Sequence, residues 1–306
     1  MLSPVTLMNP YQKLGTEVPR GMSPLAALEL AGMTGWNQRL AVPVVDGGAY
    51  PAGKHRMIVA DLPTGPAVLG AVLDSYRPIQ VEEAFVPVLD GFADGGMMPR
   101  YVGAYDNGRA CYIQFDLPSG GDLLGDGTIH TGVTLTKRND GGGAIRAYPT
   151  TTRVACANML NWLAQKNKAA VTVRHTRNAD PHVAATVERL LGLTTDWDAE
   201  MRAEIAALEA VEVTRRQYID QIVPVLVGPE PEEIGRSLTI WTRKRAELVG
   251  AWAHPTNPGG DTAWNAYNAV TVWEQHERQG TDERKALAVL HGSQPMTERL
   301  LELVRA

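Results

Sequence analysis

The chain has 306 residues, 44% of them hydrophobic and 21% charged, which is typical of a soluble globular protein with one large or two ordinary domains. A formal net charge of −5 argues against indiscriminate coating of DNA. It leaves room for a local basic site, because nearby charges set the field at a groove. Only Cys111 and Cys156 are present, without a CxxC spacing, which argues against a disulfide framework or a thiolate zinc site and favours a reducing cytoplasm. No secretion signal is evident, and no uncharged apolar segment reaches the roughly 18–20 residues that a membrane span needs.

The first third of the chain predicts an extended arm followed by a mixed region. Residues 1–22 contain several Pro and Gly, and Ser23 is placed to cap a short helix that ends near Gly32. Strands are expected at 36–45, 55–60 and 67–73, and an amphipathic helix at 81–92. Pro87 lies inside this expected helix, where proline is unfavourable.

Two β-hairpins are expected next. Asp106-Asn-Gly108 joins strands at 100–105 and 109–116, and Asn-Gly is a strong hairpin signal because both positions tolerate positive φ. Asn139-Asp-Gly-Gly-Gly143 joins strands at 129–138 and 144–148. The alternation within 129–138 predicts one buried face and one polar, partly basic face. A helix capped within Thr150–Thr152 is expected to reach Gln165, and a short strand is expected at 171–173.

Beyond Ala179 the pattern becomes helical. Helices are expected at 182–191, 198–223, 231–252, 262–279 and 282–305. We therefore predict an α+β fold, an antiparallel β-sheet with flanking helices followed by a mostly α-helical C-terminal region. The expected divisions are an N-terminal arm at 1–29, an α+β core domain at 30–178 and a helical region at 179–306.

No catalytic motif is found. The chain has no HExxH, no GxxxxGK[ST] loop and no GxSxG elbow. Cys156 lies near the start of an expected helix, where a thiol can have a lowered pKa, but a small buried residue is the simpler interpretation. The seven histidines show no ligand spacing. We therefore expect no catalytic residue, no metal, no cofactor and no enzymatic activity.

The stretch 130–177 stands out by its charge. It holds eight Lys/Arg and one acidic residue, a formal charge of +7, whereas the rest of the chain carries −12. One interpretation is a solvated surface paired with acidic helices. The other is a groove for a polyanion, in which Tyr112, Tyr148 and Trp162 are available to stack on bases.

Several short segments carry a resemblance to a known family. The most specific are Thr152-Arg-Val-Ala-Cys-Ala-Asn158 and Arg174-His-Thr176. The others are Tyr76-Arg-Pro-Ile-Gln80, Glu83-Ala-Phe85, Asn139-Asp-Gly141, Thr262-Ala-Trp264 and Asn268-Ala-Val-Thr271. Over most of 30–280 the chain resembles DUF932, a phage- and plasmid-borne family whose name records no function. The resemblance implies a mobile-element origin and a location in the host cytoplasm, and it supplies no catalytic residues.

The first functional hypothesis is a non-enzymatic protein that binds single-stranded DNA. Paired hairpins followed by a helix look like the core of ring-forming single-strand annealing proteins, a Rad52-like topology, so a homo-oligomer is expected. Asn158 and His175 would order the groove or touch bases. The expected nucleic-acid-binding residues are Lys137, Arg138, Arg146, Arg153, Asn158, Lys166, Lys168, Arg174, His175 and Arg177.

Two alternatives stay open. The first is an interaction factor that acts on a host protein and has no nucleic-acid activity. The second is an enzyme that uses Cys156 or His175, for which rapid reaction of Cys156 with a thiol probe at neutral pH would be evidence.

Overall fold

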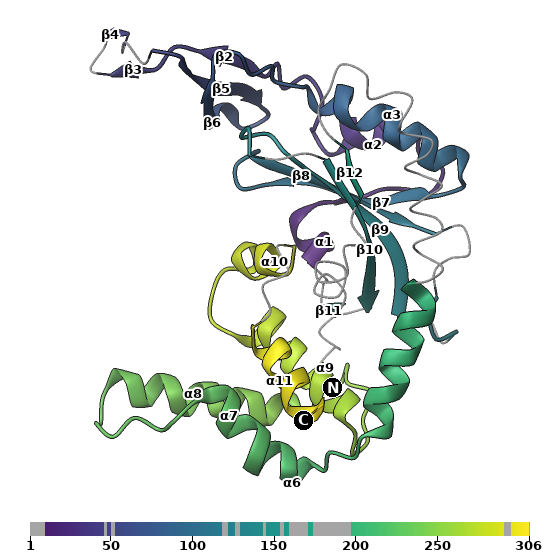
Figure 1. The fold of residues 1–306 in the computed structure, drawn as a ribbon, viewed down its shortest axis with the longest axis vertical. Coiled ribbons are helices and arrows are strands. Elements are labelled where there is room, and N and C mark those ends of the chain that lie inside the picture. The colour runs from purple at the N-terminus through teal and green to yellow at the C-terminus, as the bar shows by residue number, and fades with distance from the viewer. Residues whose placement is uncertain are drawn as a thin grey trace, which may run out of the picture. The chain divides into compact units, whose positions relative to one another are not determined.

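The computed structural model describes residues 10–45, 48–49, 53–117, 122–125, 129–142, 145–153, 156–158, 171–173, 197–290 and 295–305. The chain divides into two compact units. The sheet unit is formed by Leu14–Thr151 and Leu163–Thr195, and the helical unit by Met1–Lys13, Thr152–Trp162 and Asp196–Ala306. Figure 1 labels the elements of both units. The boundary expected near residue 178 lies outside the described residues.

The sheet unit is built on a large antiparallel sheet. Its strands lie in the order β1-β7-β8-β9-β10, and β12 also pairs with β10. The pairs β1–β7, β7–β8, β8–β9 and β10–β12 are antiparallel. The strand bounds are Thr16–Glu17 (β1), Met98–Tyr105 (β7), Ala110–Asp116 (β8), Ile129–Arg138 (β9), Ile145–Arg153 (β10) and Val171–Val173 (β12).

The first predicted hairpin is confirmed in its turn and its register. Asp106, Asn107 and Gly108 have φ angles of 52°, 51° and 78°, which is the left-handed region that the Asp-Asn-Gly sequence tolerates. Tyr105 therefore pairs directly with Ala110. The second expected hairpin is formed by β9 and β10, and the short strand expected at 171–173 is β12.

Two helices pack on one face of this sheet. They are α2 (Pro24–Leu30), which Ser23 caps as predicted, and α3 (Val81–Asp94), which begins where expected and contains Pro87. Phe92 of α3 meets Phe115 of β8 edge to face, with ring centroids 4.8 Å apart. Each such fully buried side chain contributes about 1.5–3 kcal/mol to folding. This apolar layer fixes which face of β8 and β9 is the core face.

A smaller sheet belongs to the same unit. It has the order β2-β5-β6, with bounds Arg39–Ala41, His55–Leu62 and Gly65–Leu73. The strand expected at 36–45 is divided into β2 and β3 (Val44–Val45), and β3 pairs with β4 (Gly48–Ala49). The strands expected at 55–60 and 67–73 are confirmed as β5 and β6.

The helical unit is organised around α9, in which every residue is buried. Tyr218 lies against Trp252, with ring centroids 4.8 Å apart, and its hydroxyl donates to the Leu248 carbonyl at 3.0 Å. The helices are α1 (Pro10–Leu14), a helix at 197–210, α6 (Arg215–Gln217), η1 (Tyr218–Ile222), α7 (Val223–Val227), α8 (Arg236–Ala251), α9 (Ala263–Val272), η2 (Trp273–Glu277), α10 (Asp282–Leu290) and α11 (Pro295–Arg305).

One helix prediction is wrong at its start. The chain continues as strand β10 through Arg153, and Cys156–Asn158 forms β11. The run Thr150-Thr-Thr152 is β-branched and suits a pleated strand better than a helix start. Cys156 is therefore a strand residue, and the remainder of the expected helix, to Gln165, lies outside the described residues.

The C-terminal helices are mostly as predicted, with shorter pieces. The helix expected at 198–223 ends at residue 210, and Thr214 caps the next turn with its hydroxyl bound to the Gln217 amide. The helix expected at 282–305 is α10 and α11, and the one expected at 182–191 lies outside the described residues. The α+β class is confirmed. In the described part of the chain, no helix is both long and apolar enough for a membrane crossing.

Candidate functional site

The basic stretch begins on β9, where side-chain direction decides what each residue can do. Thr134 Oγ1 of β9 lies 3.0 Å from Thr150 Oγ1 of β10, so these two threonines share a face. Because side chains alternate along a strand, Arg138 and Arg146 lie on that face as well. The opposite face carries Val133 and the other residues packed under α3. The sheet thus has a polar face with two arginines and an apolar core face.

Lys137 lies on the core face and is only 2% exposed. Its ammonium donates to Asn139 Oδ1, which also accepts from Gln38 Nε2 at 3.3 Å. Burial lowers the pKa of Lys137 to about 8, although Cys111, Glu82 and Glu83 act to raise it. Lys137 therefore offers no charge to a ligand at the surface, contrary to its expected role. The alternation within 129–138 already grouped it with Val133 and Leu135.

Arg138 and Arg146 differ in their availability. Arg138 binds the Asp140 carboxylate through Nε and a second guanidinium nitrogen, and its side chain is 39% exposed. That hydrogen bond to Asp140 raises the pKa of Arg138 above its ordinary value. Arg146 is exposed on β10. An incoming phosphate would compete with Asp140 for Arg138 but would reach Arg146 directly.

The structure describes little of the other residues that were expected to contact DNA. Arg153 ends β10 and Asn158 ends β11, and the structure describes their backbone alone. The remaining expected residues lie outside the described part of the chain: Lys166, Lys168, Arg174, His175 and Arg177.

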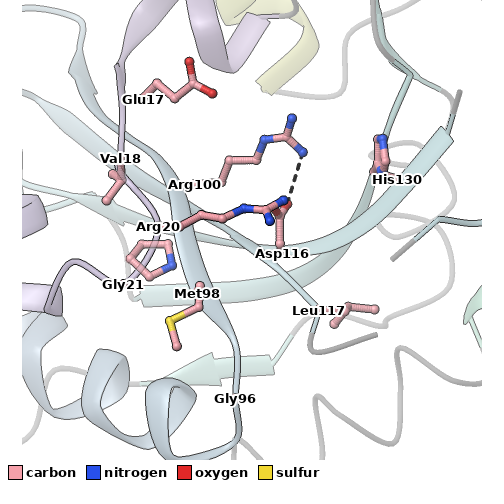
Figure 2. Close-up of a pocket in the computed structure, with 11 residues that line it drawn as sticks. Glu17, Val18, Arg20, Gly21, Gly96, Met98, Arg100, Asp116, Leu117 and His130 are labelled. Atoms are coloured by element: carbon pink, nitrogen blue, oxygen red, sulfur yellow. Dashed lines mark hydrogen bonds and ion pairs between the residues drawn. The ribbon is translucent and has the colours of Figure 1, made fainter. Parts of the chain in front are cut away.

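A cavity of about 640 Å³ lies at the other end of the large sheet (Figure 2). It is formed where the segment after β1 meets the start of β7, the end of β8 and the start of β9. Its polar side chains are Glu17, Arg20, Arg100, Asp116 and His130. Its walls are completed mainly by apolar and glycine residues: Val18, Gly21, Gly96, Met98, Pro99 and Leu117.

Arg100 is the most constrained cation of the cavity. It forms an ion pair with Asp116 at 3.4 Å, and its guanidinium lies 5.3 Å from the centroid of the Tyr101 ring. Burial acts to lower the pKa of Arg100, but Asp116 and Tyr101 together raise it above its ordinary value. Arg100 therefore stays charged at any physiological pH. Arg20, by contrast, is an exposed side chain.

A buried polar cluster joins the two hairpin turns. Asn139 Nδ2 donates to the Gly108 carbonyl at 2.9 Å and lies 3.1 Å from Cys111 Sγ. Burial raises the pKa of the Cys111 thiol to about 11, so this cysteine is an unreactive thiol at neutral pH. Gln80 and Gln38 bind each other through the Gln80 side-chain amide and the Gln38 backbone, at 2.8 and 2.9 Å. These residues hold the turns to α3.

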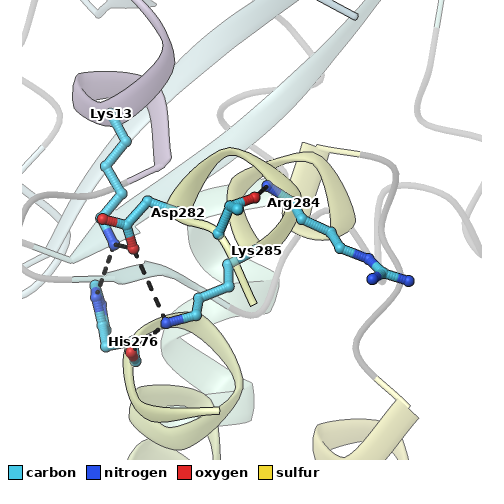
Figure 3. Close-up of polar contacts among 6 residues, drawn as sticks. Lys13, His276, Asp282, Arg284 and Lys285 are labelled. Carbon is cyan, nitrogen blue, oxygen red and sulfur yellow. Dashed lines mark hydrogen bonds and ion pairs between the residues drawn. The ribbon is translucent and has the colours of Figure 1, made fainter. Parts of the chain in front are cut away.

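The helical unit contains a charged cluster of its own (Figure 3). Lys13 of α1 reaches Asp282 at 3.2 Å and His276 Nδ1 at 3.4 Å. Lys285 donates to the His276 carbonyl at 2.6 Å and lies 3.9 Å from Asp282. The hydrogen bond from Lys13 lowers the pKa of Asp282. Every group has a partner within the cluster, so its evident role is to fasten α1 to α10.

A family model described as "Domain of unknown function (DUF932)" matches residues 68–299, which is most of the chain. The chain belongs to the DUF932 family. The searches of curated proteins and of solved structures each gave no significant match.

Several segments that resemble the DUF932 family have structural roles here. Asn139 and Gln80 form the buried cluster, and Glu83 accepts from the Gln80 amide at 3.3 Å at the start of α3. In α9, Asn268 Nδ2 binds the Trp264 carbonyl at 2.7 Å. Asn139 and Asn268 satisfy buried backbone groups, which is the usual fate of buried polar side chains, whereas the Gln80 and Glu83 contact lies at the exposed start of α3.

Sequence reasoning did not single out the cavity of Figure 2. Glu17 and Arg20 come from the segment at β1, and Arg100 and Asp116 come from the β7–β8 hairpin much later in the chain, and no motif spacing relates the two segments. His130 was noted only as the first residue of the basic stretch. Among the described residues, no group of three or more His, Cys, Asp or Glu is arranged to hold a metal ion.

Proposed function

We propose that this DUF932 protein binds single-stranded DNA without catalysing a reaction, through a surface that begins at Arg138 and Arg146. The observation that carries the proposal is that these two arginines share the polar face of adjoining strands β9 and β10. Both arginines belong to the stretch 130–177, whose formal charge is +7. A basic groove that follows a phosphate backbone suits single strands. Of the aromatic residues expected to stack on bases, Tyr112 is fully buried and does not belong to this surface, and Tyr148 is half-buried.

The basic stretch continues along the sequence beyond strands β9 and β10. The residues proposed from the sequence as further DNA contacts are Arg153, Asn158, Lys166, Lys168, Arg174, His175 and Arg177, and Lys137 is left out because its side chain is buried. In this proposal the protein is encoded by a phage or plasmid and acts as a homo-oligomer that anneals strands.

The test is the fluorescence anisotropy of a labelled oligothymidine across a salt series, with duplex DNA as comparison. We expect the single strand to be preferred and the logarithm of the affinity to fall linearly with the logarithm of salt concentration. Arg146→Gln should weaken binding several-fold and reduce the magnitude of the salt slope by about one, because one phosphate contact is lost. The double variant Lys166→Gln/Lys168→Gln should reduce the magnitude of the salt slope further.

Arg77→Gln is the matched control, since Arg77 is exposed in the sheet unit but lies outside the basic stretch. It should leave the slope unchanged. Absence of binding at low salt, or equal losses in Arg146→Gln and Arg77→Gln, would remove the basic surface from the proposal.

A second candidate function is favoured by one observation in the helical unit. Ile234, between α7 and α8, is 97% exposed, and Val225 and Ile240 are exposed large apolar residues on those helices. Single exposed apolar residues are common, but one exposed as fully as Ile234 is a candidate contact residue for a partner protein. A host protein that the wild type retains from lysate and that Ile234→Ser loses would support an interaction factor.

A further inference from the structure

The cavity of Figure 2 is large enough for a small molecule. Its volume of about 640 Å³ falls within the roughly 300–1,000 Å³ of typical ligand sites. It lies around the start of β9 at His130, whereas Arg138 lies at the far end of the same strand. The cavity is therefore distinct from the proposed strand surface near Arg138 and Arg146.

The cavity offers two kinds of cation. Arg100 is fixed by Asp116 and by the Tyr101 ring, so its orientation is set before a ligand arrives. Arg20 is exposed and lines the cavity, and among the described residues no ion pair involves it. A guanidinium presents donors in a fork that matches phosphate oxygens. Arg20 is thus the group best placed to donate hydrogen bonds to an incoming phosphate.

The cavity also offers acceptors and apolar walls. The carboxylates of Glu17 and Asp116 line it together with Val18, Met98 and Leu117. A bare phosphate ion would leave these walls and the Glu17 carboxylate unmatched, since Asp116 is already paired with Arg100, and a cationic ligand would meet Arg20 and Arg100. A ligand that fits carries a phosphate, an apolar ring and amino hydrogen-bond donors.

We propose that this cavity binds one nucleotide unit with an amino-bearing base, its phosphate on Arg20 and its base amino group on Glu17. Carboxylates accept hydrogen bonds from base amino groups, and the apolar walls cover the ring and the sugar. The inference rests on the proposed function in one respect, that the nucleotide belongs to a bound single strand. The cavity itself is tested with a free nucleotide.

Isothermal titration calorimetry of the full chain with dGMP tests the site. We expect saturable binding that Arg20→Gln weakens at least fivefold and that Arg77→Gln leaves unchanged. Both substitutions remove one exposed arginine from the sheet unit, so a general charge effect would act on both. Glu17→Gln should weaken dGMP more than dTMP, because thymine has no amino group.

Three results would overturn the inference: no saturable binding of dGMP, equal losses in Arg20→Gln and Arg77→Gln, or inorganic phosphate binding as tightly as dGMP. Oligothymidine anisotropy separates the two proposals. Strand binding that Arg146→Gln weakens, combined with no dGMP binding, rejects the cavity alone. Binding of dGMP that depends on Arg20, without strand binding, rejects the strand surface alone.

Discussion

The buried environment of Lys137 gives it a role in the fold that its residue type does not predict. The lysine pairs across the sheet with Cys111, and both side chains lie within the core of the sheet unit. The Asn139 side chain joins them, accepting from Lys137 and lying 3.1 Å from the Cys111 sulfur. Burial moves the pKa of the lysine down and that of the thiol up, since it disfavours the charged form of each. Both residues therefore act in the fold.

The lowered pKa of Lys137 predicts a pH dependence of stability. The folded pKa of about 8 is below the ordinary 10.5, so the unfolded chain binds more protons between these values and stability rises with pH across them. One pKa unit corresponds to about 1.4 kcal/mol, so the shift amounts to roughly 3 kcal/mol. Lys137→Met should be more stable than the wild type at pH 7, and this advantage should shrink by pH 9. Urea unfolding at both pH values measures it.

The exposed Lys54→Met is the control for that experiment, because it also removes one positive charge from the sheet unit. Its effect on the free energy of unfolding should be small and the same at both pH values. If the difference between Lys137→Met and the wild type did not change between pH 7 and pH 9, folding would not lower the pKa of Lys137.

At the scale of elements, glycine determines where two parts of the sheet unit can touch. A side chain at Gly70 of β6 would collide with the carbonyl oxygen of Asp140 in the β9–β10 turn. Gly141 has a φ of 85°, and a side chain there would meet Val72. The turn Asn139-Asp-Gly141 therefore packs directly on β6. This close packing explains why the turn contains a glycine at position 141.

Gly70→Ala should destabilise the protein by about 1–3 kcal/mol, because backbone must move to make room for the added methyl. Gly250→Ala serves as the matched control. Gly250 is exposed in α8 with nothing within 4 Å of the added carbon, so alanine there should stabilise by about 0.5–1 kcal/mol. Thermal or urea unfolding gives both values, and a neutral Gly70→Ala would contradict the tight contact.

At the scale of the whole molecule, the helical unit combines distant parts of the chain. Tyr11 is 1% exposed, and Lys13 reaches Asp282 and His276, so the start of the described chain is built into the same unit as the C-terminal helices (Figure 3). A C-terminal fragment that began near residue 197 would lack these contacts.

Loss of the Lys13–Asp282 pair should loosen both of its segments together. Lys13→Met and Asp282→Asn should each speed amide exchange in 10–14 and in 282–290, and a double-mutant cycle should give a coupling of about 0.2–1 kcal/mol, since Asp282 is largely exposed. The pKa of Asp282 is lowered, so this contribution is present above the unfolded pKa and is lost as pH falls through the folded value. The exposed Arg216–Asp220 pair is the control, and its loss should affect only its own helix.

The sequence alone determined the elements whose signals are local. Turn chemistry at Asp106-Asn-Gly108, the Ser23 cap and the spacing of apolar residues in 81–92 depend on near neighbours in the chain, so the corresponding hairpin and helices could be predicted. Family membership could be recognised from short segments of the same kind. The alternation within 129–138 also predicted the two faces of β9.

Only the tertiary structure decided what depends on contacts between distant segments. It showed that the β-branched run at Thr150–Thr152 extends a strand that pairs within the sheet, where a helix start was expected. It placed Lys137 under α3, where its charge is unavailable to a ligand. It also brought Arg20, Arg100 and Asp116 to one cavity. Packing and burial depend on contacts between segments that are distant in the chain, so they cannot be read from local residue spacing.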